Sequence, residues 1–477
     1  MRPRLLAALV LALLVIPASA SAAPRVQHLK FRYGPLTIHP GQNTISIDGD
    51  KVPRPKRAGW IVGFHPNLEY TNGKIPGVDV IHLHHAVWLI NGQLTFAAGE
   101  EKTNVRLPRG FGWRHEPEDR WVLNHMVHNL LPNQARVYVT YTLDFVPDSS
   151  PLAKRIRPVM TRWVDVQGGR AYPVFDVHRG TGAGGRFTYP RDDPNPYGGD
   201  GRARNQQVIQ RNGVLVQTAG HLHPGGLYTD LTLTRGGRTV NLFRSRAHYW
   251  EPAGAVSWDV AMTATRSSWR VKVKRGDVLS VSATYDSKRA SWYESMGIMP
   301  VAFAPGAPGG VDPFSGKLER RGRLTHGHLR ENDNHGGAGG GLPDARTAPD
   351  GPAATAPVAI TDFLYGQGDL LRAGAASRPP VVAAGQTLGF RNADAARTIY
   401  HTITACRAPC NRTTGIAYPL ADGPVEFDSG ELGFGPAGFT PAANRDTWAT
   451  PANLGPGTYT YFCRVHPFMR GAFRVKG

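Results

Sequence analysis

The stretch YFCRVHPFMRGAF, residues 461–473, decides the fold and the chemistry of the C-terminal part of this chain. It places a thiolate (Cys463), an imidazole (His466) and a thioether (Met469) within seven residues, and a second imidazole, His401, lies upstream. Two histidines, one cysteine and a weak axial methionine form the trigonal ligand set that holds blue copper for electron transfer. We therefore expect a tight loop between two strands to deliver three ligands to one ion.

The upstream segment supports this interpretation. PVVAAGQTLGFRNADAARTIYHTIT (Pro380–Thr404) predicts two β-strands joined by a polar turn, with His401 in the second strand. The motif CRVHPFMRG resembles the ligand loop of the amicyanins, members of the plastocyanin-like cupredoxin family. The resemblance covers roughly residues 358–477 and implies a Greek-key β-sandwich with one type 1 copper ion. Its implied ligands are His401, Cys463, His466 and Met469.

The same loop predicts how electrons reach the site. Pro467 stiffens the loop and is expected to keep the edge of His466 at the protein surface as the electron port. Phe468 would lie in an apolar docking patch, and Arg464 and Arg470 would favour an acidic redox partner.

The N-terminus predicts export. A short basic segment precedes an apolar run, residues 5–17, that is too short to span a membrane comfortably. Small residues follow, so we expect residues 1–23 to be a cleaved secretory signal, with a retained anchor as the alternative. The mature protein would then be secreted or extracytoplasmic, in the periplasm or cell envelope, without a stable membrane span.

Composition predicts an all-β protein of two to four domains. The 477 residues include 56 glycines and 39 prolines, and extended Val/Thr/Tyr runs outnumber helical patterns. The net charge of +19 fits an acidic redox partner, an anionic cell envelope or a solubilising surface. Nucleic-acid binding is not expected, because the sequence has no basic helix or aromatic platform for single strands.

Three cysteines are present, and one of them is assigned to copper. In an oxidising compartment, Cys406 and Cys410 are expected to form a local disulfide. A redox-active pair is the alternative.

Histidines concentrate in predicted strands of residues 24–150. VIHLHHAVWLING and DRWVLNHMVHNLLP carry five of them, and the regular alternation of ARVYVTYTLDFVP predicts a half-buried strand next to them. Five histidines on strands within a short stretch favour metal binding over purely structural roles. They are His82, His84, His85, His125 and His128.

Residues 151–305 predict a second all-β block. In AGHLHPGG, His221 and His223 form an H-x-H pair on an expected strand, where alternation would point both side chains to one face. Met296 and Met299 lie where a thioether could complete a copper site.

The order of these motifs resembles that of the copper type II, ascorbate-dependent monooxygenases, such as peptidylglycine α-hydroxylating monooxygenase. A His-His pair, an LPRGFGW turn, a strand with a further histidine, an H-x-H and a methionine follow one another over residues 30–305. The resemblance implies two sandwiches with one copper ion each. The implied ligands are His84, His85 and His128 for the first ion, and His221, His223 and Met296 for the second. His125 competes with His128, and Met299 competes with Met296.

Residues 306–357 break the pattern with a Gly-, Pro- and His-rich linker. Within it, His326, His328, Asp333 and His335 predict either a divalent metal site or a solvated loop docked on the second sandwich.

The sequence thus predicts an all-β chain with two tandem sandwiches (24–150 and 151–305), a linker and a cupredoxin domain (358–477). We expect a secreted copper redox protein with one type 1 copper and two further copper ions. Its electron-transfer site would serve a monooxygenase-like module that hydroxylates a substrate with O2, with a redox protein or a small reductant as partner. The alternative is a non-catalytic copper electron carrier or an envelope copper-binding protein.

Overall fold

The computed structural model describes residues 26–42, 44–49, 51–131, 133–168, 172–194, 196, 203–333, 342–371, 378–397, 399–406, 425–434 and 445–477. The predicted secretory signal lies outside them. The regular elements of the described residues are β-strands and short 3-10 helices, which confirms the all-β fold. These helices are η1 (Ala153–Arg155), η2 (Arg330–Asn332) and η4 (Ala393–Arg397). None of the described helices is long and apolar enough to cross a membrane.

The first sandwich is built around β9 (Ala135–Pro147), the strand that the sequence alternation predicts. Its residues Val137, Val139, Tyr141 and Leu143 are almost completely buried and face one core. β9 pairs with β1 (Gln27–Ile38) and β3 (Gly59–Tyr70), and β3 also pairs with β6 (Val105–Arg106) and β7 (Phe111–His115). The opposing sheet has the order β2 (Ser46–Asp48), β8 (Trp121–Asn129), β4 (Ile81–Ile90), β5 (Gln93–Ala98).

The second sandwich continues directly from the first. β10 (Arg157–Asp165) pairs in parallel with β7 and antiparallel with β21 (Ile298–Pro305), so one sheet runs through both sandwiches. β14 (Gly213–Thr218) and β18 (Val271–Val273) complete that sheet. The opposing sheet has the order β12 (Arg186–Tyr189), β19 (Val278–Asp286), β15 (Gly226–Arg235), β16 (Arg238–Tyr249), β17 (Val260–Thr265), β22 (Gly322–Leu324), with β13 (Gln206–Val208) beside β19. A small sheet joins β11 (Phe175–Val177) to β20 (Trp292–Ser295).

The C-terminal domain is a third sandwich. One sheet has the order β24 (Leu364–Tyr365), β23 (Val358–Thr361), β26 (Gly389–Asn392), β28 (Thr447–Ala449). The other has the order β25 (Val381–Ala383), β30 (Arg470–Lys476), β29 (Gly457–Phe462), β27 (Thr404–Cys406). The loop between β29 and β30 carries the CRVHPFM motif, as the sequence predicts.

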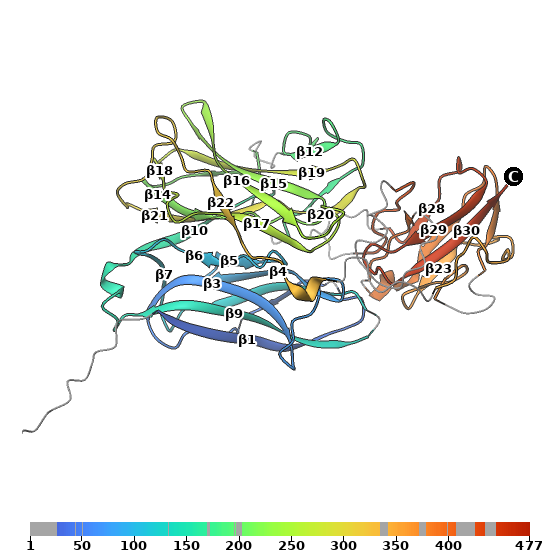
Figure 1. Cartoon of the computed structure of the whole chain (residues 1–477), viewed down its shortest axis with the longest axis horizontal. Helices are drawn as coiled ribbons and strands as arrows, with labels where there is room; N and C mark the ends of the chain where they lie inside the picture. The colour runs from blue at the N-terminus through green and yellow to red at the C-terminus, as the bar shows by residue number, and fades with distance from the viewer. Residues whose placement is uncertain are drawn as a thin grey trace, which may run out of the picture.

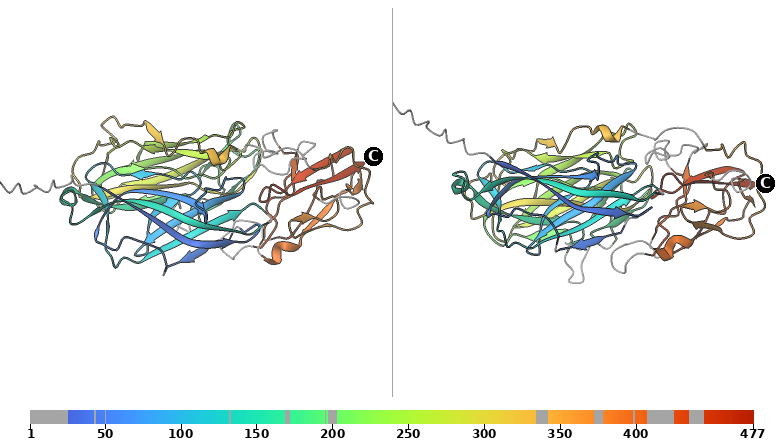
Figure 2. Two further views of the ribbon diagram at one scale, coloured as in Figure 1. Left: turned by 60° about the horizontal axis from the view of Figure 1, so that its bottom comes forward. Right: turned by 90° about the horizontal axis from the view of Figure 1, so that it is seen from below.

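The three sandwiches form an elongated particle in which the first two lie face to face and the third sits at one end (Figures 1 and 2). One buried apolar cluster extends through the second and third sandwiches, with members such as Tyr285, Trp292, Phe462 and Phe473. The third domain is therefore packed against the others and not tethered at a distance.

Two local predictions are wrong. His401 is not in a regular strand: it follows η4 and makes an isolated bridge to Leu432. His221 and His223 likewise follow the end of β14, and His221 bridges singly to Ile298. Pro224 and Gly225 turn the chain immediately afterwards, so the local alternation of a strand does not hold for this pair.

Candidate functional site

The C-terminal loop brings three donor atoms together. Sγ of Cys463 lies 3.8 Å from Nδ1 of His401 and 3.7 Å from Nδ1 of His466, and the two Nδ1 atoms are 3.1 Å apart. Consider an ion in the plane of the three donor atoms, about 2.0 Å from each imidazole nitrogen and about 2.3 Å from the thiolate sulfur. Such an ion would place the donor atoms roughly 3.5–3.7 Å from one another. Among the described residues, these three form the one group of His, Cys, Asp or Glu donors that all lie within 4.8 Å of one another.

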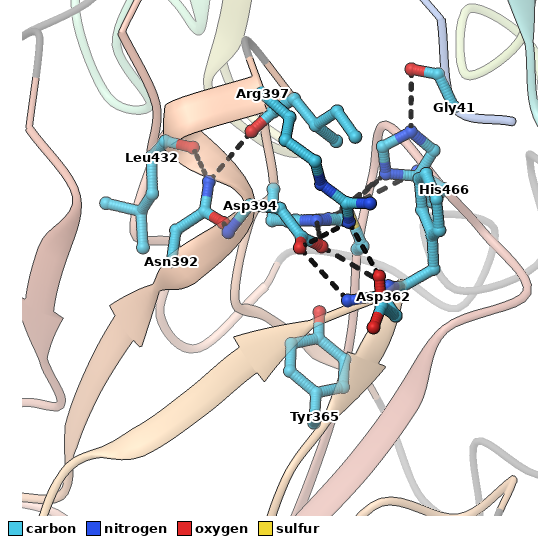
Figure 3. Close-up of polar contacts among 12 residues, drawn as sticks. Gly41, Asp362, Tyr365, Asn392, Asp394, Arg397, Leu432 and His466 are labelled. Atoms are coloured by element: carbon cyan, nitrogen blue, oxygen red, sulfur yellow. Dashed lines mark hydrogen bonds and ion pairs between the residues drawn. The ribbon is translucent and has the colours of Figure 1, made fainter. Parts of the chain in front are cut away.

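Both imidazoles are held in the tautomer that a metal requires. His401 directs Nε2 at Asp394 Oδ2 (3.0 Å), and His466 directs Nε2 at the carbonyl oxygen of Gly41 (3.3 Å) (Figure 3). Each Nε2 therefore donates a proton, which leaves the Nδ1 lone pair for a ligand. The residues present fit a metal ion without any change of tautomer.

The sulfur is also oriented. The backbone N–H groups of Thr402 and His466 each donate to Cys463 Sγ at 3.3 Å, which fixes the position of the sulfur between the two imidazoles. Cys463 is free and buried. Met469 is fully buried in the same loop, where its N–H donates to the carbonyl oxygen of His466.

Asp394 fixes the ring of His401 through the hydrogen bond to Nε2. No sequence motif indicated this role of Asp394. Burial alone would raise the pKa of this carboxyl, but the hydrogen bonds from His401, the Asp362 N–H and Arg397 outweigh burial and hold the pKa below its usual range. The Asp394 carboxylate, which therefore stays ionised, lies beside the ring of His401 on the side away from Cys463 Sγ (Figure 3). It would orient the imidazole and increase its basicity.

Asp394→Asn should keep a coloured site but lower its metal affinity roughly 10–100-fold, because the amide is neutral and binds the ring less strongly. Copper competition titrations with a chelator would measure this. Asp350→Asn is the control, since Asp350 pairs with Arg474 and Lys476 on the same domain. Unchanged affinity in Asp394→Asn would refute the role assigned to this carboxylate.

The predicted exposure of His466 is wrong. The residue is completely buried, and Phe468 is only 9% exposed, because the loop packs against the first sandwich. Gly41 makes this close approach possible: with φ +61, a Cβ there would lie 2.0 Å from Phe363 Cε1 and 2.7 Å from His466 Nε2. The edge of His466, which the sequence suggests as the electron port, thus faces another part of the same chain.

The two arginines predicted to attract an acidic partner both make contacts inside the protein. Arg464 donates to the carbonyl oxygen of Ser291 (2.5 Å) and to Asp428, and its guanidinium lies over Trp292. Arg470 is fully buried and donates to the carbonyl oxygen of Met469. Arg464 fastens the third sandwich to the second.

The six candidate donors of the N-terminal half are all buried between the first two sandwiches, but they divide differently from the sets that the resemblance implied. His85, His221 and Met296 line an apolar cavity of about 390 Å³. His84, His128 and His223 line a smaller cavity of about 120 Å³ next to the third sandwich. His84 and His85 are neighbours on β4 and line different cavities, although their Nδ1 atoms lie 3.4 Å apart and the pairing of β4 with β8 shifts register between Leu83 and His85. The implied assignment to two copper ions stays a prediction.

The larger cavity has a polar end. His221 directs Nδ1 at Glu101 Oε2 (3.0 Å), and His85 directs Nε2 at Asn124 Oδ1 (3.1 Å). Nε2 of His221 makes no hydrogen bond among the described residues. Most of the remaining wall is aliphatic or aromatic, with contributions from β4, β5, β10, β14 and β21.

The structure separates the competing candidates by position. His128 lines the small cavity, whereas the ring of His125, an odd number of residues away on β8, packs against Tyr33. Met296 lines the large cavity, whereas Met299 lies in the apolar core of the second sandwich. His128 and Met296 are therefore the better placed donors.

The His-rich linker has a structural role in its described part. Both ring nitrogens of His326 contact backbone oxygens, those of Gly327 and Val260. His328 lies 3.4 Å from Asp333, and His335 lies outside the described residues. Asn332 binds the Val78 N–H and Asp259, so this segment docks on both sandwiches. Metal binding here stays a prediction. Cys406 is disulfide-bonded, whereas its predicted partner, Cys410, lies outside the described residues.

Several residues of these sites carried no recognisable motif. Gly41, Phe363, Asn124 and Glu431 reach the sites only through tertiary packing. Glu101 had a weak signal, since Glu100-Glu101-Lys102 is a charged run that interrupts an apolar region.

Comparison with known proteins assigns no family. No family model and no curated protein matches the chain. Among solved structures, a copper-containing nitrite reductase from Thermus scotoductus SA-01 matches at 14% identity over 56% of this chain and 59% of that chain, with a TM-score of 0.16. A structure of the infectious bursal disease virus Gx strain matches at 10% identity over 59% of this chain and 72% of that chain, with a TM-score of 0.17.

The buried imidazoles should make the metal-free protein sensitive to acid. Burial lowers the pKa of His85 from 6.5 to about 4 and that of His128 to about 3. Between these values and 6.5 the unfolded state binds more protons, so stability is present above pH 6.5 and is lost as the pH falls. Each histidine should cost roughly 2 kcal/mol at pH 5 relative to pH 7.

Urea unfolding of the copper-free protein at pH 7 and pH 5 would measure this loss. His85→Gln should reduce the difference by roughly 2 kcal/mol, since glutamine does not titrate. An unfolding free energy that is the same at both pH values would contradict burial of neutral histidines.

Proposed function

We propose that this chain is an extracytoplasmic copper protein that carries single electrons through a type 1 site formed by His401, Cys463, His466 and Met469. The observation that carries the proposal is the buried trigonal cluster, in which both Nδ1 atoms and the thiolate converge and each second nitrogen is fixed by an oxygen. Copper bound by such ligands supplies reversible one-electron chemistry. The surrounding contacts hold the ligands in place, so little rearrangement accompanies a change of charge.

The proposed direction of electron flow is within the chain. His466 is buried against Gly41, and its ring centroid lies 6.1 Å from that of His128 on β8. His128 lies among the candidate donors of the N-terminal half. The contact supports an internal route from the third sandwich to the first two, with a redox protein or small reductant loading the C-terminal site.

A monooxygenase-like activity of the N-terminal half is the finer part of the proposal. The apolar cavity lined by His85, His221 and Met296 favours it, because it combines donors suited to copper with room for an apolar substrate that would be hydroxylated with O2. The second candidate function is a non-catalytic electron carrier or envelope copper-binding protein, which the tight packing of the histidines between the sandwiches also supports.

Location outside the cytoplasm is proposed from the sequence of residues 1–23 and from the disulfide at Cys406, since disulfides persist in oxidising compartments.

Copper counting, an absorption spectrum and an oxygen electrode together test these proposals. Protein loaded with copper(II) should show an intense band near roughly 600 nm, as expected for thiolate-to-copper charge transfer. A colourless, fully loaded protein would overturn the type 1 site. Oxygen uptake with ascorbate and apolar candidate substrates would support hydroxylation, whereas its absence in a blue, fully loaded sample would favour the carrier.

A further inference from the structure

A pocket between the first two sandwiches is lined by three arginines, and we call it the arginine pocket. Arg106 comes from β6 of the first sandwich, Arg266 directly follows β17, and Arg323 lies in the neighbouring strand β22. The other lining residues are Leu107, Pro108, Val216, Gln217, Thr265 and Ser267. None of these lining residues is acidic, so three positive charges gather around the pocket without a negative charge in its wall.

The three arginines also lack acidic partners beyond the wall. None of them forms an ion pair with a carboxylate among the described residues. Asp144 lines a second pocket that shares Arg106 and Arg323 with the first. Its carboxylate is already hydrogen-bonded to the rings of His28 and His65. The arginine pocket therefore keeps its positive charge within the folded chain.

Tertiary contacts hold two of these arginines close together. Nη2 of Arg323 lies 3.5 Å from the carbonyl oxygen of Asn104, two residues before Arg106, and the side-chain amide of Asn104 donates to the carbonyl oxygen of Thr325 (3.2 Å). Burial and the charge of Arg106 both lower the pKa of Arg323. An anion between the guanidinium groups would relieve this repulsion, and the planar guanidinium fork matches the oxygen atoms of an oxyanion.

Gln217 adds an uncharged donor to the pocket. Its side chain lies on β14, is only 7% exposed and makes no hydrogen bond among the described residues. A buried amide without a partner is costly, because folding removes it from water and returns no hydrogen bond. The Gln217 amide next to three unpaired arginines therefore points independently to a ligand that carries acceptor oxygens.

The size and charge of the pocket narrow the class of ligand. Its volume of about 490 Å³ falls within the range of small-molecule sites, roughly 300–1,000 Å³. Leu107, Pro108 and Val216 supply an apolar part of the wall, which an inorganic ion would leave unused. A phosphate group carries a charge of about −1.5 to −2 at pH 7 and three strong acceptor oxygens, so it matches three arginines better than a single carboxylate does.

We propose that the arginine pocket binds the phosphate group of a small organic molecule. Arg106, Arg266 and Arg323 would surround the phosphate group, the Gln217 amide would donate to one of its oxygens, and the organic part would lie against the apolar wall. The site goes beyond the proposed function, because none of its residues belongs to a candidate copper set.

Titration calorimetry of the copper-loaded full chain with phenyl phosphate, at constant ionic strength, tests the proposal. One molecule should bind per chain, and benzoate should bind at least tenfold more weakly because it carries less charge. Inorganic phosphate should bind more weakly than phenyl phosphate because it lacks an apolar part. The absence of saturable binding, or benzoate that binds as tightly, would overturn the proposal. Inorganic phosphate that binds as tightly would overturn the organic ligand.

Variants place the binding in the pocket. Arg266→Gln and Arg323→Gln should each weaken the binding of phenyl phosphate roughly tenfold, since each removes a charged hydrogen-bond donor. The matched control is Arg136→Gln, which removes the same charge from an exposed position at the start of β9 and should leave the affinity unchanged. Equal losses in all three variants would show non-specific attraction and would overturn the site. Because binding is measured as heat and not through the copper spectrum, a failure of this site and a failure of the proposed function are separate results.

Discussion

Replacing Cys463 by serine is expected to abolish the blue colour and to remove one copper ion per chain. The thiolate is the donor whose charge transfer produces the intense band, and a serine hydroxyl is neither charged at neutral pH nor soft. Sγ of Cys463 also accepts hydrogen bonds from two backbone N–H groups. The Oγ atom of a serine would accept them at a different donor–acceptor distance. Absorption spectra and metal analysis of the loaded variant would measure the loss.

Met469→Leu is the matched control for this variant. Met469 is fully buried in the same loop, and an axial thioether binds copper weakly, so leucine should preserve the band while changing the reduction potential. Copper bound in the N-terminal half should remain in both variants. A band that survives in Cys463→Ser, or a loss of all copper, would contradict a separate type 1 site.

Gly41→Val is expected to separate the C-terminal site from the first sandwich. The added Cβ would lie 2.0 Å from Phe363 and 2.7 Å from His466, and the positive φ at this position disfavours any side chain. The loop would have to move away, so electron transfer into the N-terminal half should slow several-fold, because the rate falls as the gap between the two sites widens. The band should persist, because the ligands belong to the third sandwich.

Gly73→Val provides the comparison, since Gly73 also has a positive φ (+84) but has no atom within 4 Å of an added Cβ. It should carry the backbone strain without moving the loop. Rapid reduction of the C-terminal site followed by its reoxidation would give the rate in both variants. Equal rates in Gly41→Val and the wild type would show that the Gly41–His466 contact is not the route.

The internal contact changes the expected role of the basic surface. Arg464, which the sequence suggests as an attractant for an acidic partner, contacts Ser291 of the second sandwich, and Arg470 is buried within the third sandwich. If a reductant loads the C-terminal site, as we propose, it would approach from another direction than the buried His466 edge.

Much of the fold could be predicted from local pattern. The alternation in residues 135–147 predicts β9, and the spacing of Cys463, His466 and Met469 predicts a ligand loop, because a two-residue strand period and a tight turn are set by neighbouring residues. Those features depend on separations of a few residues, so the sequence reveals them directly.

The partition of the N-terminal histidines could not be predicted in the same way. The sequence determined that this chain is all-β, carries a His/Cys/His ligand cluster and is rich in strand histidines. Only the tertiary structure decided that His466 is buried against Gly41, that Asp394 supports His401, and that His84 faces His223 from another sandwich. The physical reason is that these contacts join residues far apart in the chain, and their geometry depends on how finished sheets pack against one another.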